Sequence, residues 1–322
     1  MDEASLGAML ASTLRLATPL ILCALAGLFS ERSGVVDIGL EGKMLFAAFA
    51  AGAAGAAYGS TPIALVAAMA VSVALSWMHG FACVSYRGDQ VVSGVAINII
   101  AVGLTVVLGI AWFHQGGQTP PVDTSVRIQP LFPEAGTWLS GIPLVGRVLG
   151  EGLLVHSALV YFAYALVPAV WWLVFRTRFG LRLRAVGENP QMVDAAGVSV
   201  KRLRYTALTL NGMLCGLAGS YLVLAQSANF SANMTAGRGF MALAALIFGR
   251  WHPVGALWAC LLFGFLDAAA IRMQGVPMPL VGEVPVQFIQ ALPYVLTVVL
   301  LAGFIGKAVA PQALGKPYLK ER

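Results

Sequence analysis

The sequence predicts an all-α, polytopic integral membrane protein with about nine transmembrane helices, or eight to ten if re-entrant pieces are counted differently. Hydrophobic residues make up 59% of the 322 residues and charged residues only 11%, whereas about 25% of a soluble globular domain is charged. Several apolar runs exceed the roughly 18 residues needed to cross the hydrocarbon core. Because lipid offers the backbone no hydrogen bonds, such runs span as helices.

The expected spans follow one another with short polar gaps. Phe240–Phe248 is too short to cross comfortably alone, and either includes a few preceding residues or begins as a broken helix. The stretch 114–152 is rich in Pro, Gly and polar residues and is expected to be an external loop with an interfacial segment. The whole chain, 1–322, is interpreted as one transmembrane domain. The expected spans are 6–29, 35–59, 62–86, 91–113, 153–175, 205–226, a seventh around 240–248, 254–271 and 286–306.

The distribution of Lys and Arg orients these spans. If the polar loop 176–204 is cytoplasmic, alternation places the N-terminus outside and the C-terminus inside. Fourteen basic residues then lie on the inner side and four on the outer side, namely Arg127, Arg147, Arg238 and Arg272. This asymmetry satisfies the positive-inside rule. The net charge of +6 therefore reports orientation, and no nucleic-acid partner is implied.

The second expected span carries the sharpest local feature, two carboxylates and a lysine in the segment ERSGVVDIGLEGK. A charge at a helix centre costs about 2.5–3.5 kcal/mol on insertion scales, so Asp37 and Glu41 need a partner, water or a broken backbone. Four residues apart, they would share a helical face, with Arg15 or Lys43 as partner. Two interpretations stay open: a discontinuous helix beside a permeation route, or a structural charge pair that locks the first two spans together.

Four asparagines extend the set of candidate pathway residues. Asn98 and Asn211 lie inside expected spans, where an amide most often forms an interhelical hydrogen bond. Asn229 and Asn233 lie near the expected outer mouth and could meet a polar solute. The four cysteines each stand alone in an apolar run and are interpreted as small buried hydrophobic residues.

The loop 176–204 is the only long polar interval whose charge is strongly of one sign. The loop contains seven basic residues and only two acidic ones, Glu188 and Asp194. A short helix is expected from Gln191 to Ala196, because Pro190 suits a helix start and Gly197 a helix end. The loop is interpreted either as a cytoplasmic docking element or as a simple solvated, positive-inside loop.

Catalytic motifs are absent from the sequence. The four histidines are far apart, and the chain contains neither an HExxH metal helix nor a GxxxxGK[ST] phosphate loop. The sequence thus predicts a protein that is not an enzyme and that holds no metal and no cofactor of its own.

Four segments, in this order, resemble the permease subunits of bacterial ABC importers of the branched-chain amino acid, ribose and nucleoside class. The resemblance is greatest to the shorter permease of nucleoside importers that use a basic-membrane-lipoprotein-type binding protein. The matching segments are ERSGVVDIGLEGKM, GDQVVSGVAINIIAVGLT, GLRLRAVGENPQMVDAAGVSV and GRGFMALAALIFGRWHPVGA.

The resemblance implies a multi-pass permease of the bacterial inner membrane with several partners. An ABC ATPase that binds ATP and Mg would dock below, a second related permease would lie alongside, and an extracytoplasmic binding protein would deliver the solute; membrane lipid surrounds the chain. The family's ATPase-coupling loop maps onto Gly187, Glu188, Asn189, Asp194, Ala195, Ala196 and Gly197.

Three functional hypotheses remain on this basis. The resemblance favours ATP-driven import of nucleosides or related nucleobase compounds, with a simple sugar such as a pentose as the alternative solute. A third hypothesis, of another class, is an ion-coupled secondary transporter in which Asp37 and Glu41 bind the coupling ion. The candidate pathway residues are Asp37, Glu41, Asn98, Asn211, Asn229 and Asn233.

Overall fold

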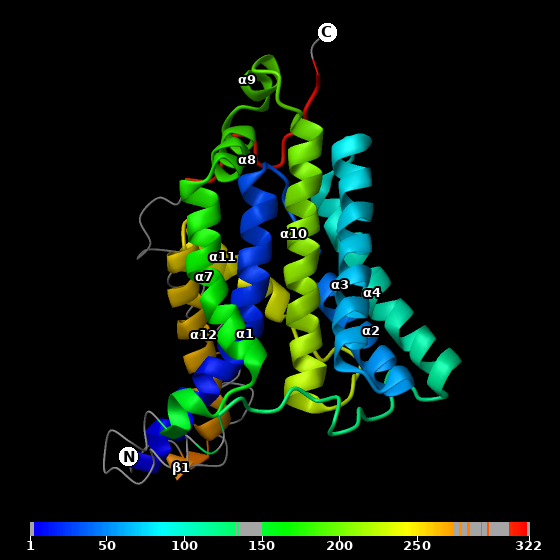
Figure 1. The fold of residues 1–322 in the computed structure, drawn as a ribbon, viewed down its shortest axis with the longest axis vertical. Coiled ribbons are helices and arrows are strands. Elements are labelled where there is room, and N and C mark those ends of the chain that lie inside the picture. The colour runs from blue at the N-terminus through cyan, green and yellow to red at the C-terminus, as the bar shows by residue number, and fades with distance from the viewer. Residues whose placement is uncertain are drawn as a thin grey trace.

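The protein is an elongated bundle of helices (Figure 1). The computed structural model describes residues 3–132, 134, 150–273, 277–278, 282–283, 291, 295 and 309–320. The long helices are α1 (Glu3–Arg32), α2 (Leu40–Tyr58), α3 (Thr61–Gly80), α4 (Gln90–Phe113), α7 (Ala158–Arg176), α10 (Val200–Tyr221) and α12 (Pro253–Met273). The shorter elements are the π-helical turns η1 (Phe81–Ser85), η2 (Gly150–Leu154) and η3 (Leu222–Ser227), the helices α8 (Arg178–Glu188), α9 (Pro190–Ala195) and α11 (Arg238–Phe248), and the antiparallel two-residue strands β1 (Pro277–Met278) and β2 (Gly282–Glu283).

Six helices in the described part of the chain are long and apolar enough to cross a membrane. They coincide with six of the expected spans, so the predicted all-helical membrane class is confirmed. The span expected at 286–306 lies almost wholly outside the described residues, as does the interfacial segment expected near Trp138, and the total of nine stays a prediction. The six are Leu6–Arg32, Thr61–Ser85, Gln90–Phe113, Ala158–Arg176, Val200–Ser227 and Pro253–Met273.

The second expected span differs from the prediction at its start. Helix α2 begins only at Leu40, not at residue 35, and is not among the six membrane-crossing candidates. The chain turns at Gly34, whose φ is +84°, and the Asp37 side chain accepts a hydrogen bond from the Gly39 amide (3.1 Å). This local turn holds Asp37 outside the helix, so the prediction that Asp37 and Glu41 share a helical face is wrong.

Helix α11 has only 11 residues, which confirms that the seventh apolar segment is short. The chain before it is irregular, with positive φ at Ala228, Asn233, Ala236 and Gly237. Within the described residues, therefore, α11 begins as a broken helix, the second of the two expected forms.

Two central helices, α1 and α10, organise the core. Helix α1 packs against α12, α11 and α10, while α10 packs against α3, α2 and α1. Close approach depends on small residues: an added Cβ at Gly212 or Gly216 would lie 2.6 Å from the Cα of Val73 or Met69 on α3. These glycines lie four residues apart and therefore share one face of α10, as is common at helix interfaces in membranes.

The two ends of the bundle differ in what they carry. The N-terminus lies at one end of the long axis, and α8, α9 and the C-terminus lie at the other (Figure 1). Residues 309–320 lie at this same end of the bundle (Figure 1), where the Ala313 amide donates to the Gly187 carbonyl of α8 (2.8 Å). The opposite placement of the termini fits an odd number of crossings, and which end faces the cytoplasm stays a prediction.

Candidate functional site

The short helix predicted in the central loop is present as α9. The Asn189 side chain caps it by accepting from the Met192 amide (3.1 Å), Pro190 is its first residue, and Gly197 follows its end with a φ of +78°. These are the capping and stop signals on which the prediction rested. Helix α8, which precedes it, was not predicted; its signal was the apolar spacing of Leu183 and Val186, now both buried.

We refer to α8 and α9 together as the platform. Its tip is exposed: the Met192 side chain is 70% exposed, and five of the seven predicted coupling residues are also exposed, while Asp194 is half-buried and Gly187 is buried. Gly187 is a packing residue, because an added Cβ would collide with the carbonyl oxygen of Arg32 at the end of α1. The platform is therefore seated directly on α1. The five exposed residues are Glu188, Asn189, Ala195, Ala196 and Gly197.

The C-terminal segment packs against the platform. The Gln312 amide donates to the Glu188 carboxylate (3.3 Å), and the Gly315 amide donates to the Gly34 carbonyl (3.2 Å) beyond the end of α1. Tyr318 packs against the small apolar cluster of Val186, Val193 and Val200. This contact was missed, because an exposed basic tail carries no sequence pattern that marks where it docks.

Arginine and aromatic side chains join the platform to the turn between α11 and α12. The Arg32 guanidinium donates through Nε (3.0 Å) and Nη2 (2.7 Å) to the Trp251 carbonyl, and Arg184 of α8 lies 4.9 Å from the Phe175 ring centroid. The His252 ring packs against the same ring, with the ring centroids 5.0 Å apart and the planes tilted by 39°. Burial, reinforced by the charge of Arg32, lowers the pKa of His252, so this histidine is neutral at pH 7.

A fully buried ion pair lies deeper in the bundle. The Lys43 ammonium is 2.5 Å from the Asp37 carboxylate, and both side chains have no exposed surface. Lys43 also donates to Asn211 of α10 (3.1 Å), and Asn211 donates to the Ala26 carbonyl of α1 (3.0 Å). Ser76 of α3 donates to the same Asn211 oxygen (3.1 Å). The network thus ties together α1, α2, α3 and α10, with Lys43 as the partner and not Arg15.

The same junction holds a buried histidine. His79 contacts the Val36 carbonyl through Nε2 (2.9 Å) and the Ser93 hydroxyl through Nδ1 (3.0 Å). Since a carbonyl can only accept, Nε2 carries the proton and Nδ1 accepts from Ser93. His79 therefore fastens the segment before α2 to α3 and α4.

Glu41 has a different role from Asp37. Its two carboxylate oxygens accept from the backbone amides of Gly237 (2.8 Å) and Gly239 (2.6 Å) at the start of α11. A carboxylate at a helix N-terminus satisfies amides that have no partner within the helix and interacts favourably with the helix dipole. Glu41 thus holds the broken start of α11 against α2.

The four candidate asparagines separate into two pairs. Asn98 bridges α4 to α2, accepting from the Gly42 amide (2.8 Å) and donating to the Ile38 carbonyl (3.1 Å), and Asn211 belongs to the buried network. Asn229 is half-buried and Asn233 exposed, in the irregular segment before α11. Among the described residues, neither is hydrogen-bonded to the network, so the structure does not bring all six candidates into one site.

Comparison with known proteins matches the chain over nearly its whole length. The family described as "Branched-chain amino acid transport system / permease component" matches residues 9–304. The guanosine ABC transporter permease protein NupQ of Bacillus subtilis (strain 168) is 40% identical over 315 residues, covering 96% of this chain and 95% of that protein.

Two further relatives cover the chain as completely. The nucleoside ABC transporter permease protein NupC of Lactococcus lactis subsp. cremoris (strain MG1363) is 39% identical over 324 residues, 97% of this chain and 96% of that protein. The putative glucose ABC transporter permease protein TsgC13 of Haloferax volcanii (strain ATCC 29605) is 33% identical over 332 residues, 97% of this chain and 98% of that protein.

Proposed function

The chain belongs to the branched-chain amino acid transport system permease component family, and from this premise we propose that it is the transmembrane permease subunit of an ATP-driven ABC importer of nucleosides or related nucleobase compounds. The main support for nucleosides as the solute is that the chain is 40% identical, over 96% of its length, to a guanosine permease. A second relative with "nucleoside" in its name is 39% identical over 97% of the chain. The 33% identity to a putative glucose permease keeps a simple sugar, such as a pentose, as the second candidate.

The partners follow from the subunit's place in such an importer. We propose that a separate ATPase chain, which binds ATP and Mg, docks on the platform, and that a second related permease and an extracytoplasmic binding protein complete the assembly. The end of the bundle that carries α8 and α9 then faces the cytoplasm, with the N-terminus outside, in a bacterial inner membrane. The exposed Met192 and the open surface around Gly197, where an added Cβ would meet nothing within 4 Å, support docking there.

The seating of the platform suggests how ATPase movement would reach the bundle. Gly187 is pressed against the end of α1, and the C-terminal segment links the platform to the turn at Gly34. A tilt of the platform would therefore act on α1 and on the segment that leads to Asp37. Because packed helices move as rigid units, such a displacement would be transmitted to the Lys43 network.

The ion-coupled alternative is supported less well by the contacts of its carboxylates. Asp37 is paired with Lys43, and both oxygens of Glu41 accept backbone amides. A coupling ion would have to displace those partners. We therefore assign both carboxylates to holding α2 and α11 in place, at the border of the solute pathway.

Uptake in proteoliposomes tests the solute class and the energy source together. The chain, co-expressed with its ATPase and second permease, would be reconstituted with the binding protein outside and ATP inside, and labelled guanosine uptake measured against excess uridine, ribose or glucose. Guanosine uptake that uridine reduces and the sugars do not is expected, whereas absence of guanosine uptake together with uptake of labelled ribose or glucose would select the second candidate. Uptake that needs an ion gradient and proceeds without ATP would contradict the proposal.

The docking surface can be tested with two glycines that share the same geometry. Gly197 and Gly59 both end a helix with positive φ, +78° and +60°, and an added Cβ would meet nothing within 4 Å at either. Each donates its amide to a carbonyl, that of Asp194 (2.9 Å) or Gly55 (3.0 Å), so proline removes one hydrogen bond at both. Gly197→Pro is expected to abolish ATP-dependent uptake, and Gly59→Pro to spare it. Equal losses would argue against docking at the platform.

A further inference from the structure

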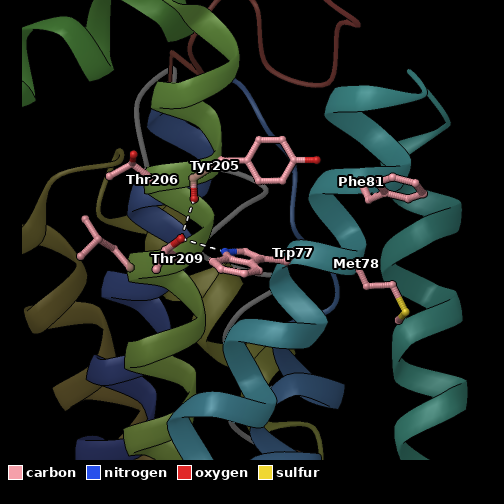
Figure 2. Close-up of a pocket in the computed structure, with 7 residues that line it drawn as sticks. Trp77, Met78, Phe81, Tyr205, Thr206 and Thr209 are labelled. Carbon is pink, nitrogen blue, oxygen red and sulfur yellow. Dashed lines mark hydrogen bonds between the residues drawn. The ribbon is translucent and has the colours of Figure 1, made fainter.

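A groove of about 700 Å³ lies between α10 and the end of α3 with η1, on the outer surface of the bundle. Figure 2 shows Trp77, Met78 and Phe81 on one wall and Tyr205, Thr206 and Thr209 on the other. Three large apolar side chains are open to the surroundings: Trp77 is 53%, Met78 42% and Phe81 56% exposed.

The polar atoms along the groove are satisfied by the walls themselves. The Trp77 indole donates to the Thr209 hydroxyl (2.9 Å), and the Thr209 hydroxyl donates to the Tyr205 carbonyl (2.9 Å). The Tyr205 hydroxyl and the Ser85 hydroxyl are bonded to each other at 2.7 Å. The surface left for an occupant between the helices is therefore mainly apolar.

The end of the groove nearest the platform is basic. The Lys201 ammonium lies 6.0 Å from the centre of the Tyr205 ring, and the neighbouring Arg202 is exposed. Neither has a carboxylate partner among the described residues. Lys201 and Leu210 are nine residues apart, so at 1.5 Å per residue the basic end lies about 14 Å along the helix from the far apolar wall.

An occupant of this groove must therefore be anionic at one end and apolar over about 14 Å. We propose that the groove binds an anionic phospholipid of the inner leaflet, with its phosphate at Lys201 and Arg202 and an acyl chain against Trp77, Phe81 and Leu210. Basic pockets between membrane helices on the cytoplasmic side recognise such headgroups, and an aromatic belt suits the same depth. The inference rests on the orientation given under the proposed function.

The position of the headgroup would affect the platform. Lys201 and Arg202 stand in the first turn of α10, and the amide of Arg202 is capped by the Ser199 hydroxyl (3.3 Å) just beyond α9. A bound phosphate would therefore hold the start of α10 to the membrane surface.

Lipid retention on the purified protein tests the proposal without transport. The permease complex would be purified in mild detergent, exposed to equal amounts of phosphatidylglycerol and phosphatidylcholine with the same acyl chains, and examined by native mass spectrometry. Selective phosphatidylglycerol binding is expected, weakened about fivefold for each basic residue removed and about 30-fold in the double variant Lys201→Ala/Arg202→Ala. Lys320→Ala, which removes an exposed lysine of the C-terminal segment, is the matched control and should bind as wild type does.

A photo-reactive benzoylphenylalanine at Phe81, in cells, identifies what covers the groove. A cross-link to phospholipid that is lost in the Lys201/Arg202 double variant supports the proposal. A cross-link to another protein chain, or equal binding of both lipids, would overturn it. Neither readout involves ATP or a nucleoside, so a failure here leaves the transport proposal standing, and a failure of uptake leaves lipid binding standing.

Discussion

Removing the buried lysine of the ion pair is the most demanding test of the structure. In Lys43→Met the side chain keeps its length, but Asp37, which has no exposed surface, loses the one ion-pair partner that it has among the described residues. The carboxylate must then stay buried as a charge or take up a proton. Breaking a buried pair by removing one partner costs about 3–5 kcal/mol.

A second argument gives the same magnitude. Protonating a carboxyl group whose unperturbed pKa is near 3.9 costs about 1.4 kcal/mol for each pH unit above that value. At pH 7, about three units above it, the cost is roughly 4 kcal/mol. Protonation thus limits the penalty to about this value. At roughly 2–4 °C per kcal/mol for a chain of this size, the apparent melting temperature should fall by about 10 °C.

The assay is thermal unfolding in detergent, followed by intrinsic fluorescence at one fixed scan rate, since such proteins unfold irreversibly. The double variant Asp37→Asn/Lys43→Met should recover most of the loss, because neutral partners leave no buried charge. Lowering the pH from 7 to 5 should also reduce the deficit of Lys43→Met relative to wild type, because protonation becomes cheaper. A single variant that melts within about 2 °C of wild type, or a double variant no better than the single one, would refute a buried charge pair.

Four further predictions follow from single contacts. In Glu41→Gln the side chain has one acceptor oxygen in place of two and can accept only one of the two amides. The free energy of unfolding should fall by about 1.5–3 kcal/mol, and uptake should fall with it. An unchanged melting temperature would contradict the anchoring of α11. Met192→Glu should reduce ATPase recovery on copurification at least about tenfold, equivalent to 1.4 kcal/mol, with no change in melting, because the side chain is 70% exposed. Tyr58→Glu, at the end of α2 and outside the platform, changes a residue that is 69% exposed and is the control that should retain the ATPase. Removing residues 311–322 deletes the bonds to Gly187 and Glu188 of α8 and the packing of Tyr318 against the cluster that includes Val193 of α9. Amide exchange in α8 and α9 should therefore become faster, while that in α4 stays the same. The pKa of His252 lies below its usual value near 6.5, so the unfolded chain binds more protons and stability should fall as the pH drops below about 6.5. His252→Asn should therefore flatten the dependence of the melting temperature on pH between pH 7 and 5, and an unaltered slope would count against a neutral ring packed on Phe175.

The sequence by itself determined the features whose causes are local. Apolar runs long enough to cross a bilayer predicted the six described spans, because each must satisfy its own backbone hydrogen bonds. Asn189, Pro190 and Gly197 predicted the ends of α9, because capping and positive φ are properties of a few adjacent residues. The cysteines, all four buried and free, were likewise predicted from their apolar neighbours.

The tertiary structure alone decided how distant polar groups meet. Lys43, and not Arg15, pairs with Asp37, and Glu41 reaches amides almost two hundred residues further along the chain. The C-terminal segment docks against α8 through backbone amides, which every sequence possesses. A buried charge must find a partner wherever packing offers one. Its presence can therefore be read from sequence, but the identity of its partner depends on which helices the glycine-lined faces bring together.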